Sequence, residues 1–316
     1  MNPEVLICSS LYDFSTDLVC VELDRIGIDY VRINREHFKD YRISLNPLNP
    51  NITINMGELT YEVGPRLKSI WFRQPVFLRN TPADPLTISQ QLERSQWMAF
   101  LRGMCVFDQV AWMNFPARTY LAESKPYQLY TAKKCGFTVP QTCISNDSYE
   151  IQNQFPDVAA IKSLDTVLVR DGDNSLFTYT SVRNTSTLCE EKTYHSPMIA
   201  QELLKNKIDL RITIVGNKLF SVRVLAFGEG VEGDWRLVMS DKIQYEDVDL
   251  PESLHLMCLE LLKELGLSFG AVDLVEAQDH MYFIEVNPTG EWGWLDGVSR
   301  PIATTIAMWL ADPYVR

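Results

Sequence analysis

The sequence predicts an α+β protein whose N-terminal domain is α/β. Three observations support this fold class: short apolar runs alternate with helical patterns in the first 120 residues, many short apolar segments follow one another after that, and 46% of the 316 residues are hydrophobic. A chain of this length and composition is globular and holds about two domains at roughly 100–200 residues each.

The first part of the chain begins with a strand and a helix. Residues 5–8 form an apolar run that two serines close, and residues 14–26 carry apolar side chains at helical spacing before Gly27, as a helix that ends at a glycine does. The segment from Trp112 to Pro116 interrupts the pattern and marks a domain boundary. The other elements expected before this boundary are strands at 30–33 and 69–72, a hairpin at 51–63 and a helix at 86–107.

The second part of the chain predicts a mixed, mostly antiparallel sheet arrangement, because many short strands follow one another with few helices between them. We find no internal repeat and no low-complexity tract. The expected helices are 124–134, 147–155 and 251–265. The expected strands are 158–162, 167–170, 177–182, 198–201, 208–215, 218–225, 270–275 and 281–286.

The charge of the chain excludes two kinds of partner. The 41 acidic and 29 basic side chains give a net charge of −12, and residues 121–316 carry 28 acidic and 17 basic side chains, hence 11 of the 12 net negative charges. An acidic protein of this kind is disfavoured on phosphate backbones and on anionic membrane surfaces. We therefore expect no nucleic-acid and no membrane partner, and a homodimer is compatible with the sequence.

Cysteines and histidines give no metal or hydrolase pattern. The seven cysteines are scattered without a CxxC, and the four histidines are equally dispersed, which argues against a disulfide framework, a zinc site and a Ser/His/Asp triad. The start of the chain lacks a basic and apolar signal pattern, and no apolar run reaches the roughly 18 residues of a membrane span. We expect a cytoplasmic protein.

The most informative acidic residues are Asp273, Glu285 and Asn287. In a strand, Glu285 and Asn287 point to the same face about 7 Å apart, and a neighbouring antiparallel strand can place Asp273 beside them. Three hard oxygen ligands then converge, as Mg²⁺ prefers when it is bound together with substrate phosphates. The alternative is a solvated strand face, but the buried alternation of Ile284 and Val286 leaves these polar residues unexplained by it.

A cationic counterpart to these acids is available in Lys125, Lys162 and Arg211. Lys162 ends an apolar strand, Lys125 lies on the expected helix 124–134, and Arg211 shares a strand face with Asp209. A lysine offers a point charge and an arginine a fork for phosphate oxygens, so the three side chains can neutralise a triphosphate. Taken one by one, each is more often an ordinary surface residue, and their order along the chain is the stronger observation.

Two further segments have competing interpretations. Residues 228–233 match GxGxxG, but they follow a strand and lead into Asp234-Trp235-Arg236 rather than a helix, so we interpret them as a flexible loop that delivers Arg236 and not as a dinucleotide site. The hairpin at 166–182, with a polar turn at 171–174, is either a lid or peptide-binding ribbon or an ordinary hairpin.

The order of these motifs resembles that of ATP-grasp carboxylate ligases. The segments IAQELLKNKIDLRITIVGNKLFSVRV, GDWR and FIEVNPTGEWGWLD look like RimK-type ligases, and more closely like the microviridin-type (MvdC/MvdD) peptide ligases that make graspetides. The first half is similar to the pre-ATP-grasp domain of that group through the segment 69–75 and the Ser15-Thr16-Asp17 helix opening. Where the group usually has Arg-Arg-Pro, this chain has Arg73-Gln74-Pro75, which leaves the role of that loop open. The expected glycine-rich loop after Lys162 is replaced by residues without glycine.

The resemblance implies an ATP-grasp fold with a pre-ATP-grasp domain at residues 1–118, a small lobe at 119–190 and a large lobe with the Mg-ATP site at 191–316. It implies that ATP phosphates are bound by two lysines, the adenine by a hinge, the ribose by an aspartate, the γ-phosphate or acyl phosphate by two arginines, and Mg²⁺ by three oxygen ligands. The lysines are Lys125 and Lys162, and the hinge is Gln201, Glu202 and Leu203. The aspartate is Asp209, and the arginines are Arg211 and Arg236. The Mg²⁺ ligands are Asp273, Glu285 and Asn287.

The reaction implied by the resemblance activates a carboxylate with ATP as an acyl phosphate, which a hydroxyl or amine then attacks. For a graspetide ligase the carboxylates are Asp or Glu side chains of a ribosomally made precursor peptide, with a leader and a core, and the acceptors are its Thr/Ser or Lys side chains. The first alternative is a RimK-like ligase that adds an amino acid to a protein or small-molecule carboxylate. The second is a non-catalytic ATP-binding or peptide-binding protein that retains the fold.

Overall fold

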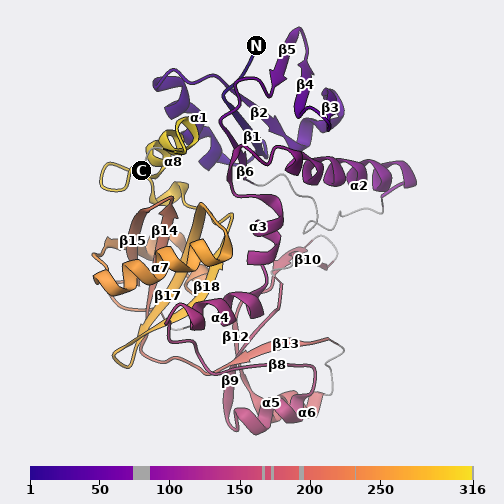
Figure 1. The fold of residues 1–316 in the computed structure, drawn as a ribbon. Coiled ribbons are helices and arrows are strands. Elements are labelled where there is room, and N and C mark those ends of the chain that lie inside the picture. The colour runs from indigo at the N-terminus through magenta and orange to yellow at the C-terminus, as the bar shows by residue number, and fades with distance from the viewer. Residues whose placement is uncertain (74–85, 166–167, 172–173, 192–195, 232, 315–316) are drawn as a thin grey trace.

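The computed structural model describes the chain except for residues 74–85, 166–167, 172–173, 192–195, 232 and 315–316. Three tiers follow one another along the molecule in Figure 1, and each is built around a β-sheet of four or five strands. The N-terminal residues lie in the first tier. Among the helices that the structure describes, none is long and apolar enough to cross a membrane.

The first tier is an α/β domain around a parallel sheet, as the sequence predicts. Strands β1 (Val5–Ser9) and β6 (Ser69–Phe72) pair at its centre, with β2 (Tyr30–Asn34) and β7 (Ala111–Met113) outside them. Because the chain runs from β1 to β2 on one side and β6 to β7 on the other, the carboxyl ends of β1 and β6 border a topological switch point, where such sheets place their binding sites.

The remaining elements of this tier cover the sheet. The expected hairpin at 51–63 is confirmed, and β3 extends it by one strand that the sequence analysis missed, although Ile43 and Leu45 alternate with exposed polar residues as in a half-buried strand. These elements are β3 (Arg42–Asn46), β4 (Asn51–Met56), β5 (Leu59–Val63), α1 (Phe14–Arg25), α2 (Ile88–Gly103) and the 3-10 helices at Arg35–Asp40 and Met104–Val106.

The tier at the opposite end is an antiparallel sheet, here called the small sheet. Its strands lie in the order β12 (Ser181–Asn184), β9 (Val158–Lys162), β13 (Met198–Gln201) and β8 (Thr142–Ser145). Helices α5 (Ser148–Gln154) and α6 (Thr185–Glu191) pack together beside it (Figure 1). The sheet extends past the lobe boundary that we expect at residue 190, because β13 pairs with both β8 and β9. Strands β10 (Leu168–Asp171) and β11 (Asn174–Phe177) form a separate pair.

The middle tier is a five-stranded antiparallel sheet, here called the central sheet. Helix α7 (Glu252–Leu265) and α4 (Lys125–Lys134) pack on it through a buried cluster, and α3 (Pro116–Ala122) leads into α4. The predicted antiparallel pattern of this half is confirmed. The strand order is β16 (Ile243–Asp247), β15 (Lys218–Ala226), β14 (Ile208–Val215), β17 (Phe269–Ala277) and β18 (His280–Asn287). Three more 3-10 helices lie at Trp235–Leu237, Ser240–Lys242 and Gly293–Leu295.

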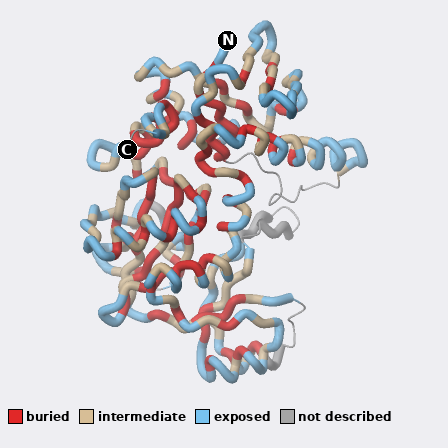
Figure 2. Tube along the Cα trace, in the orientation of Figure 1, coloured by how far each residue is buried: buried red, intermediate tan, exposed pale blue. Residues whose placement is uncertain are grey.

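The two ends of the chain share one hydrophobic core. Helix α8 (Ile302–Ala311) lies against α1 of the first tier (Figure 1), and its residues Ile302, Ile306 and Leu310 are fully buried. The same cluster contains Val5 of β1 and Val222 of β15, so the red buried stretches of the first and middle tiers adjoin in Figure 2. Burying this apolar surface holds the first tier firmly on the central sheet.

Asn114 joins these two tiers by hydrogen bonds. Its Nδ2 donates to the carbonyls of Phe269, at 2.9 Å, and Pro288, at 2.8 Å, while its Oδ1 accepts from the backbone N–H groups of Ser268 and Phe269. The side chain is 2% exposed. Asn114 therefore fixes the start of β17 and the residue after β18 from the first tier.

Replacing Asn114 with Asp is expected to lower the free energy of unfolding by roughly 3 kcal/mol. The Asp oxygen that takes the place of Nδ2 accepts hydrogen bonds and does not donate them. The buried carbonyls of Phe269 and Pro288 therefore lose their donor and face a desolvated carboxyl group. Urea unfolding followed by circular dichroism measures the change. Asn49→Asp, on an exposed loop residue, is the control and should stay within about 0.5 kcal/mol of the parent. Equal stability of the two variants would contradict this role.

Candidate active site

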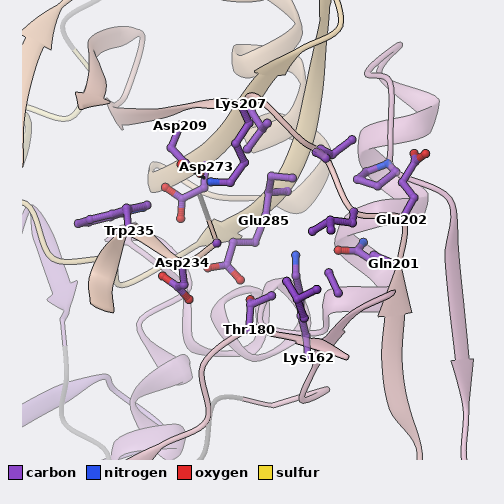
Figure 3. Close-up of a pocket in the computed structure, with 18 of the residues that line it drawn as sticks. Lys162, Thr180, Gln201, Glu202, Lys207, Asp209, Asp234, Trp235, Asp273 and Glu285 are labelled. Atoms are coloured by element: carbon purple, nitrogen blue, oxygen red, sulfur yellow. Dashed lines mark hydrogen bonds and ion pairs between the residues drawn. The ribbon is translucent and has the colours of Figure 1, made fainter. Parts of the chain in front are cut away.

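A cleft separates the small sheet from the central sheet. It contains about 750 Å³ of empty space, which includes some open solvent at its mouth. A second hollow adjoins it through the shared residues Lys162, Arg236 and Glu285. All the residues that the sequence marks for this site, except Arg211 and Asn287, line one of the two hollows. Figure 3 shows Lys162 projecting from the small-sheet side, with Asp209, Asp273 and Glu285 on the opposite side.

The acidic pair lies in direct cross-strand register. Asp273 of β17 is opposite Glu285 of β18, and a bulge between Asp273 and Leu274 follows the pair. Asn287, two residues beyond Glu285, is exposed at the end of β18, where its Oδ1 accepts from the N–H of Thr289 at 3.1 Å. The predicted juxtaposition of Asp273 and Glu285 is confirmed, and Asn287 lies at the end of the same strand, outside the residues that line the two hollows.

Glu285 is surrounded by cations from three separate parts of the chain. Its carboxylate lies 3.7 Å from Nζ of Lys125 on α4 and 3.6 Å from Nη1 of Arg236. Burial alone raises the pKa of the Glu285 carboxyl, but Lys125 and the other nearby cations outweigh burial and lower the pKa. Burial lowers the pKa of the Lys162 ammonium, against the opposing attraction of Glu285. Glu285 is therefore ionised, with the positive charges of Lys125, Lys162 and Arg236 around it.

Arg211 is the partner of the second acid. Its Nη1 donates to both carboxylate oxygens of Asp273 at 2.9 Å, and its Nη2 donates to the carbonyl of Glu291 at 3.1 Å. Burial raises the pKa of Asp273, while Arg211 acts against that increase. Arg211 lies behind Asp273 and not on the cleft wall, so its position supports the acid from one side.

Asp209 is paired with a lysine that the sequence analysis did not single out. Its carboxylate accepts from Nζ of Lys207, and both residues line the cleft. Burial raises the pKa of Asp209, and the charge of Lys207 opposes this. Lys207 lies just before β14 in a segment without secondary-structure periodicity, so spacing along the chain gave no sign of it.

The predicted hinge connects the small sheet to the rest of the cleft. Nε2 of the buried Gln201 donates to Oγ1 of Thr142 at 2.9 Å. Glu202 donates its N–H to the carbonyl of Gln141, and its carboxylate accepts from the N–H of Gln141 at 2.9 Å. Leu203 lines the cleft beside an apolar wall that suits a planar ring. The other members of this wall are Ala160, Val182, Leu204, Val275 and Ile284.

The described residues of the GxGxxG segment, which exclude residue 232, lie in a loop, as the sequence predicts, and this loop leads to Arg236 in the cleft. The loop runs from the end of β15 to Asp234, which accepts from the N–H of Arg236 and begins the 3-10 helix at Trp235–Leu237. Two further bonds from the Arg236 guanidinium to Asp234, both 2.9 Å, fix its orientation. Asp234 and Trp235 also line the cleft, and the polar loop pattern did not separate them from ordinary surface residues.

Gly230 is required where this loop touches β14. A Cβ atom on Gly230 would lie 1.9 Å from the carbonyl oxygen of Lys207, which is backbone and has little freedom to move. Gly230→Ala is therefore expected to displace the loop and lower ATP-dependent activity about tenfold or more, because small misplacements of positioning groups are costly. Steady-state kinetics measures the loss. Gly103→Ala is the control, since Gly103 lies outside the cleft with a φ of −62° and its Cβ would meet nothing within 4 Å.

Some predicted features lie outside the described residues. Gln74 and Pro75 of the loop after Arg73, and the turn residues 172–173 of the polar hairpin, belong to this group. Arg73 itself is described and is buried between the first and middle tiers.

The donor set of the cleft fits Mg²⁺. Asp273 and Glu285 present carboxylate oxygens side by side, with the amide oxygen of Asn287 farther along the strand. Over the part of the chain that the structure describes, no three His, Cys, Asp or Glu side chains group to hold a metal by themselves. Two carboxylates that leave room for water and phosphate ligands are the usual protein share of a magnesium site.

Comparisons with known proteins identify a matching family and similar folds. The model of the RimK-like ATP-grasp domain matches residues 125–313. A tetrahydromethanopterin:α-L-glutamate ligase of Methanocaldococcus jannaschii is 28% identical over 117 residues, which span 36% of this chain and 39% of that protein. The matched segment is therefore less than half of this curated relative.

Two solved structures are similar over the whole chain. A RiPP-associated ATP-grasp ligase of Chryseobacterium gregarium, solved with ADP and a leader and core peptide, has a TM-score of 0.85 at 25% identity and covers 100% of this chain and 98% of its own. The macrocyclase MdnC of Microcystis aeruginosa, bound with the precursor peptide MdnA, has a TM-score of 0.83 at 23% identity over 99% and 100%. The α+β fold with an ATP-grasp arrangement is thus confirmed.

Proposed function

Since the chain belongs to the family of RimK-like ATP-grasp domains, we propose that it is an ATP-dependent carboxylate ligase that forms macrocyclic ester or amide bonds in a ribosomally made precursor peptide. One observation carries the ligase proposal: Lys125, Arg236 and Lys162 surround Glu285, and Asp273 lies beside it, where the cleft meets the second hollow. The cleft combines acids for a metal with cations for phosphates, as phosphoryl transfer needs.

The proposed chemistry has two steps. A carboxylate oxygen of a peptide Asp or Glu attacks the γ-phosphorus of ATP, and ADP leaves with the electron pair of the broken bond. A Thr/Ser hydroxyl or Lys amine then attacks the acyl carbon, loses its proton, and inorganic phosphate leaves. Each ring formed removes one water from the peptide overall.

The residues of this chain contribute by binding and orientation. Lys125 and Lys162 bind the phosphates, and the apolar wall beside Leu203 holds the adenine. Asp273 and Glu285, with Asn287, hold Mg²⁺, which when bound neutralises phosphate oxygens and aligns them. Arg236, after the loop that follows β15, binds the acyl phosphate, and the loop excludes water from this labile group.

The choice of a peptide substrate is supported by the extent of the structural similarity. The ligase of Chryseobacterium gregarium matches the N-terminal tier as well as the ATP-grasp part, and it was solved with a leader and core peptide. We propose the same partner class for this chain, a leader-bearing precursor, in the cytoplasm. The curated relative is a glutamate ligase, which favours addition of an amino acid to another molecule as the second candidate.

Mass spectrometry of a precursor peptide tests the proposal. The substrate is a short peptide rich in Thr and Asp/Glu, encoded beside the gene for this chain, and it is incubated with the protein and Mg-ATP. Loss of one water per new bond, with one ADP released for each, is the expected result. Unchanged peptide together with ADP release on adding free amino acids would overturn the macrocyclase proposal in favour of the second candidate.

A further inference from the structure

The segment that follows β18 is held by the N-terminal domain. Arg73, at the carboxyl end of β6, is 1% exposed. Its Nη1 donates to the carbonyls of Thr289 and Gly290, the latter at 3.1 Å. Its Nε lies 3.1 Å from the carboxylate of Asp13, and its Nη2 lies 3.0 Å from that of Glu291. One buried guanidinium thus spans from the first tier to three consecutive residues of the middle tier.

Ser15 makes the second attachment from the same domain. Its Oγ donates to the carboxylate of Glu291 at 3.0 Å and accepts from the N–H of Gly293 at 3.2 Å. Ser15 lies in the first turn of α1, where the helix dipole favours a carboxylate. Residues 289–293 of the chain itself therefore contact the side chains that follow β1 and β6, beside the switch point where sheets of this kind place their ligands.

The held segment in turn contacts the acidic pair. The carbonyl of Glu291 accepts from Nη2 of Arg211 at 3.1 Å, and Nη1 of Arg211 donates to Asp273. The packing is close, because a Cβ atom on Gly290 would lie 2.8 Å from Nη2 of Arg211 and 2.6 Å from Cβ of Ala271. A displacement of residues 289–291 therefore moves the guanidinium that orients Asp273.

We propose that Arg73 is a positioning residue for the metal-nucleotide site, and that the N-terminal domain sets the geometry of Asp273 through the 289–291 segment and Arg211. The proposal rests on the proposed function for its metal and nucleotide. It assigns Arg73 a part in the site that is separate from any contact with the peptide. Groups that orient a metal ligand from behind typically change metal affinity by about tenfold to a hundredfold when they are replaced.

Arg73→Lys is the test variant, because it keeps a cation beside Asp13 but lacks the fork that reaches two carbonyls. Titration calorimetry with ADP measures affinity in EDTA and then at increasing Mg²⁺, without peptide or turnover. In EDTA, we expect the ADP affinity of Arg73→Lys to stay within about twofold of the parent. The Mg²⁺ concentration that gives half of the maximal increase in ADP affinity should be about tenfold higher for the variant. Arg66→Lys is the matched control, since Arg66 forms exposed ion pairs with Glu4 and Asp29 away from this segment.

Two outcomes overturn the proposal. One is a Mg²⁺ requirement of Arg73→Lys within twofold of the parent, and the other is a parallel loss of ADP affinity in EDTA, which would indicate general damage. If Arg73→Lys fails to fold, Ser15→Ala decides, because it removes one contact to Glu291 and one to the adjoining Gly293 without leaving a buried charge. A Mg²⁺ requirement raised about threefold or more supports the proposal, and an unchanged one overturns it. A parent protein that binds ADP with Mg²⁺ but modifies no peptide refutes the proposed function alone.

Discussion

Replacing Glu285 with Gln is expected to lower ATP-dependent ligase activity about a thousandfold. The amide keeps the shape of the side chain but removes the negative charge on which Lys125 and Arg236 converge. It also removes one of the two carboxylates that face the cleft as Mg²⁺ ligands. ADP release at saturating Mg-ATP, together with the mass of the peptide product, measures the loss.

The matched control for this prediction is Glu276→Gln. Glu276 lies on β17 of the same sheet, where it forms a partly exposed ion pair with Arg223, and the substitution makes the same chemical change outside the cleft. Its activity should stay close to that of the parent. If Glu285→Gln retained more than about a tenth of the activity, Glu285 would be a structural acid and the metal site would have to lie elsewhere.

Lys162→Met is expected to lower kcat/KM for ATP about a hundredfold or more. The substitution keeps a long unbranched side chain on β9 but removes the cation that the small sheet contributes to the cleft. Without this charge the phosphates are held from the central-sheet side alone. Initial rates over a range of ATP concentrations measure the effect. Lys134→Met is the control with unchanged rates, because Lys134 of α4 forms an exposed ion pair with Glu264 of α7.

The direction of the Lys162 pKa adds a dependence on pH. Burial lowers the pKa of this ammonium below 10.5, so its charge is lost at a lower pH than that of an ordinary lysine. Binding that needs the charge is complete below the lowered pKa and decreases as the pH rises through it. Lys162→Arg stays charged over this range, so its nucleotide binding should persist to higher pH. Identical alkaline profiles for the parent and the Arg variant would exclude Lys162 as the titrating group.

The acidic pair was predictable from the sequence because its geometry is local. Alternation along residues 281–287 places Glu285 and Asn287 on one face, and a turn after Ala277 leads back antiparallel, so Asp273 reaches Glu285 in register. Lys207, Asp234 and Trp235 were missed for the opposite reason. They come from loops, where neither a period of 2 nor one of 3.6 relates a residue to a face.

The sequence by itself determined the fold class, the strands and helices that carry the motifs, and the chemistry of the acids, because side-chain periodicity and residue type act over a few residues. The tertiary structure decided which cations meet Glu285 and what lies behind Asp273. Arg73 and the carbonyl of Gly290 are separated by 217 positions, and no local pattern relates them. Their contact exists because α8 buries its apolar face against α1 and β1 and so brings the switch point of the first tier onto the end of β18.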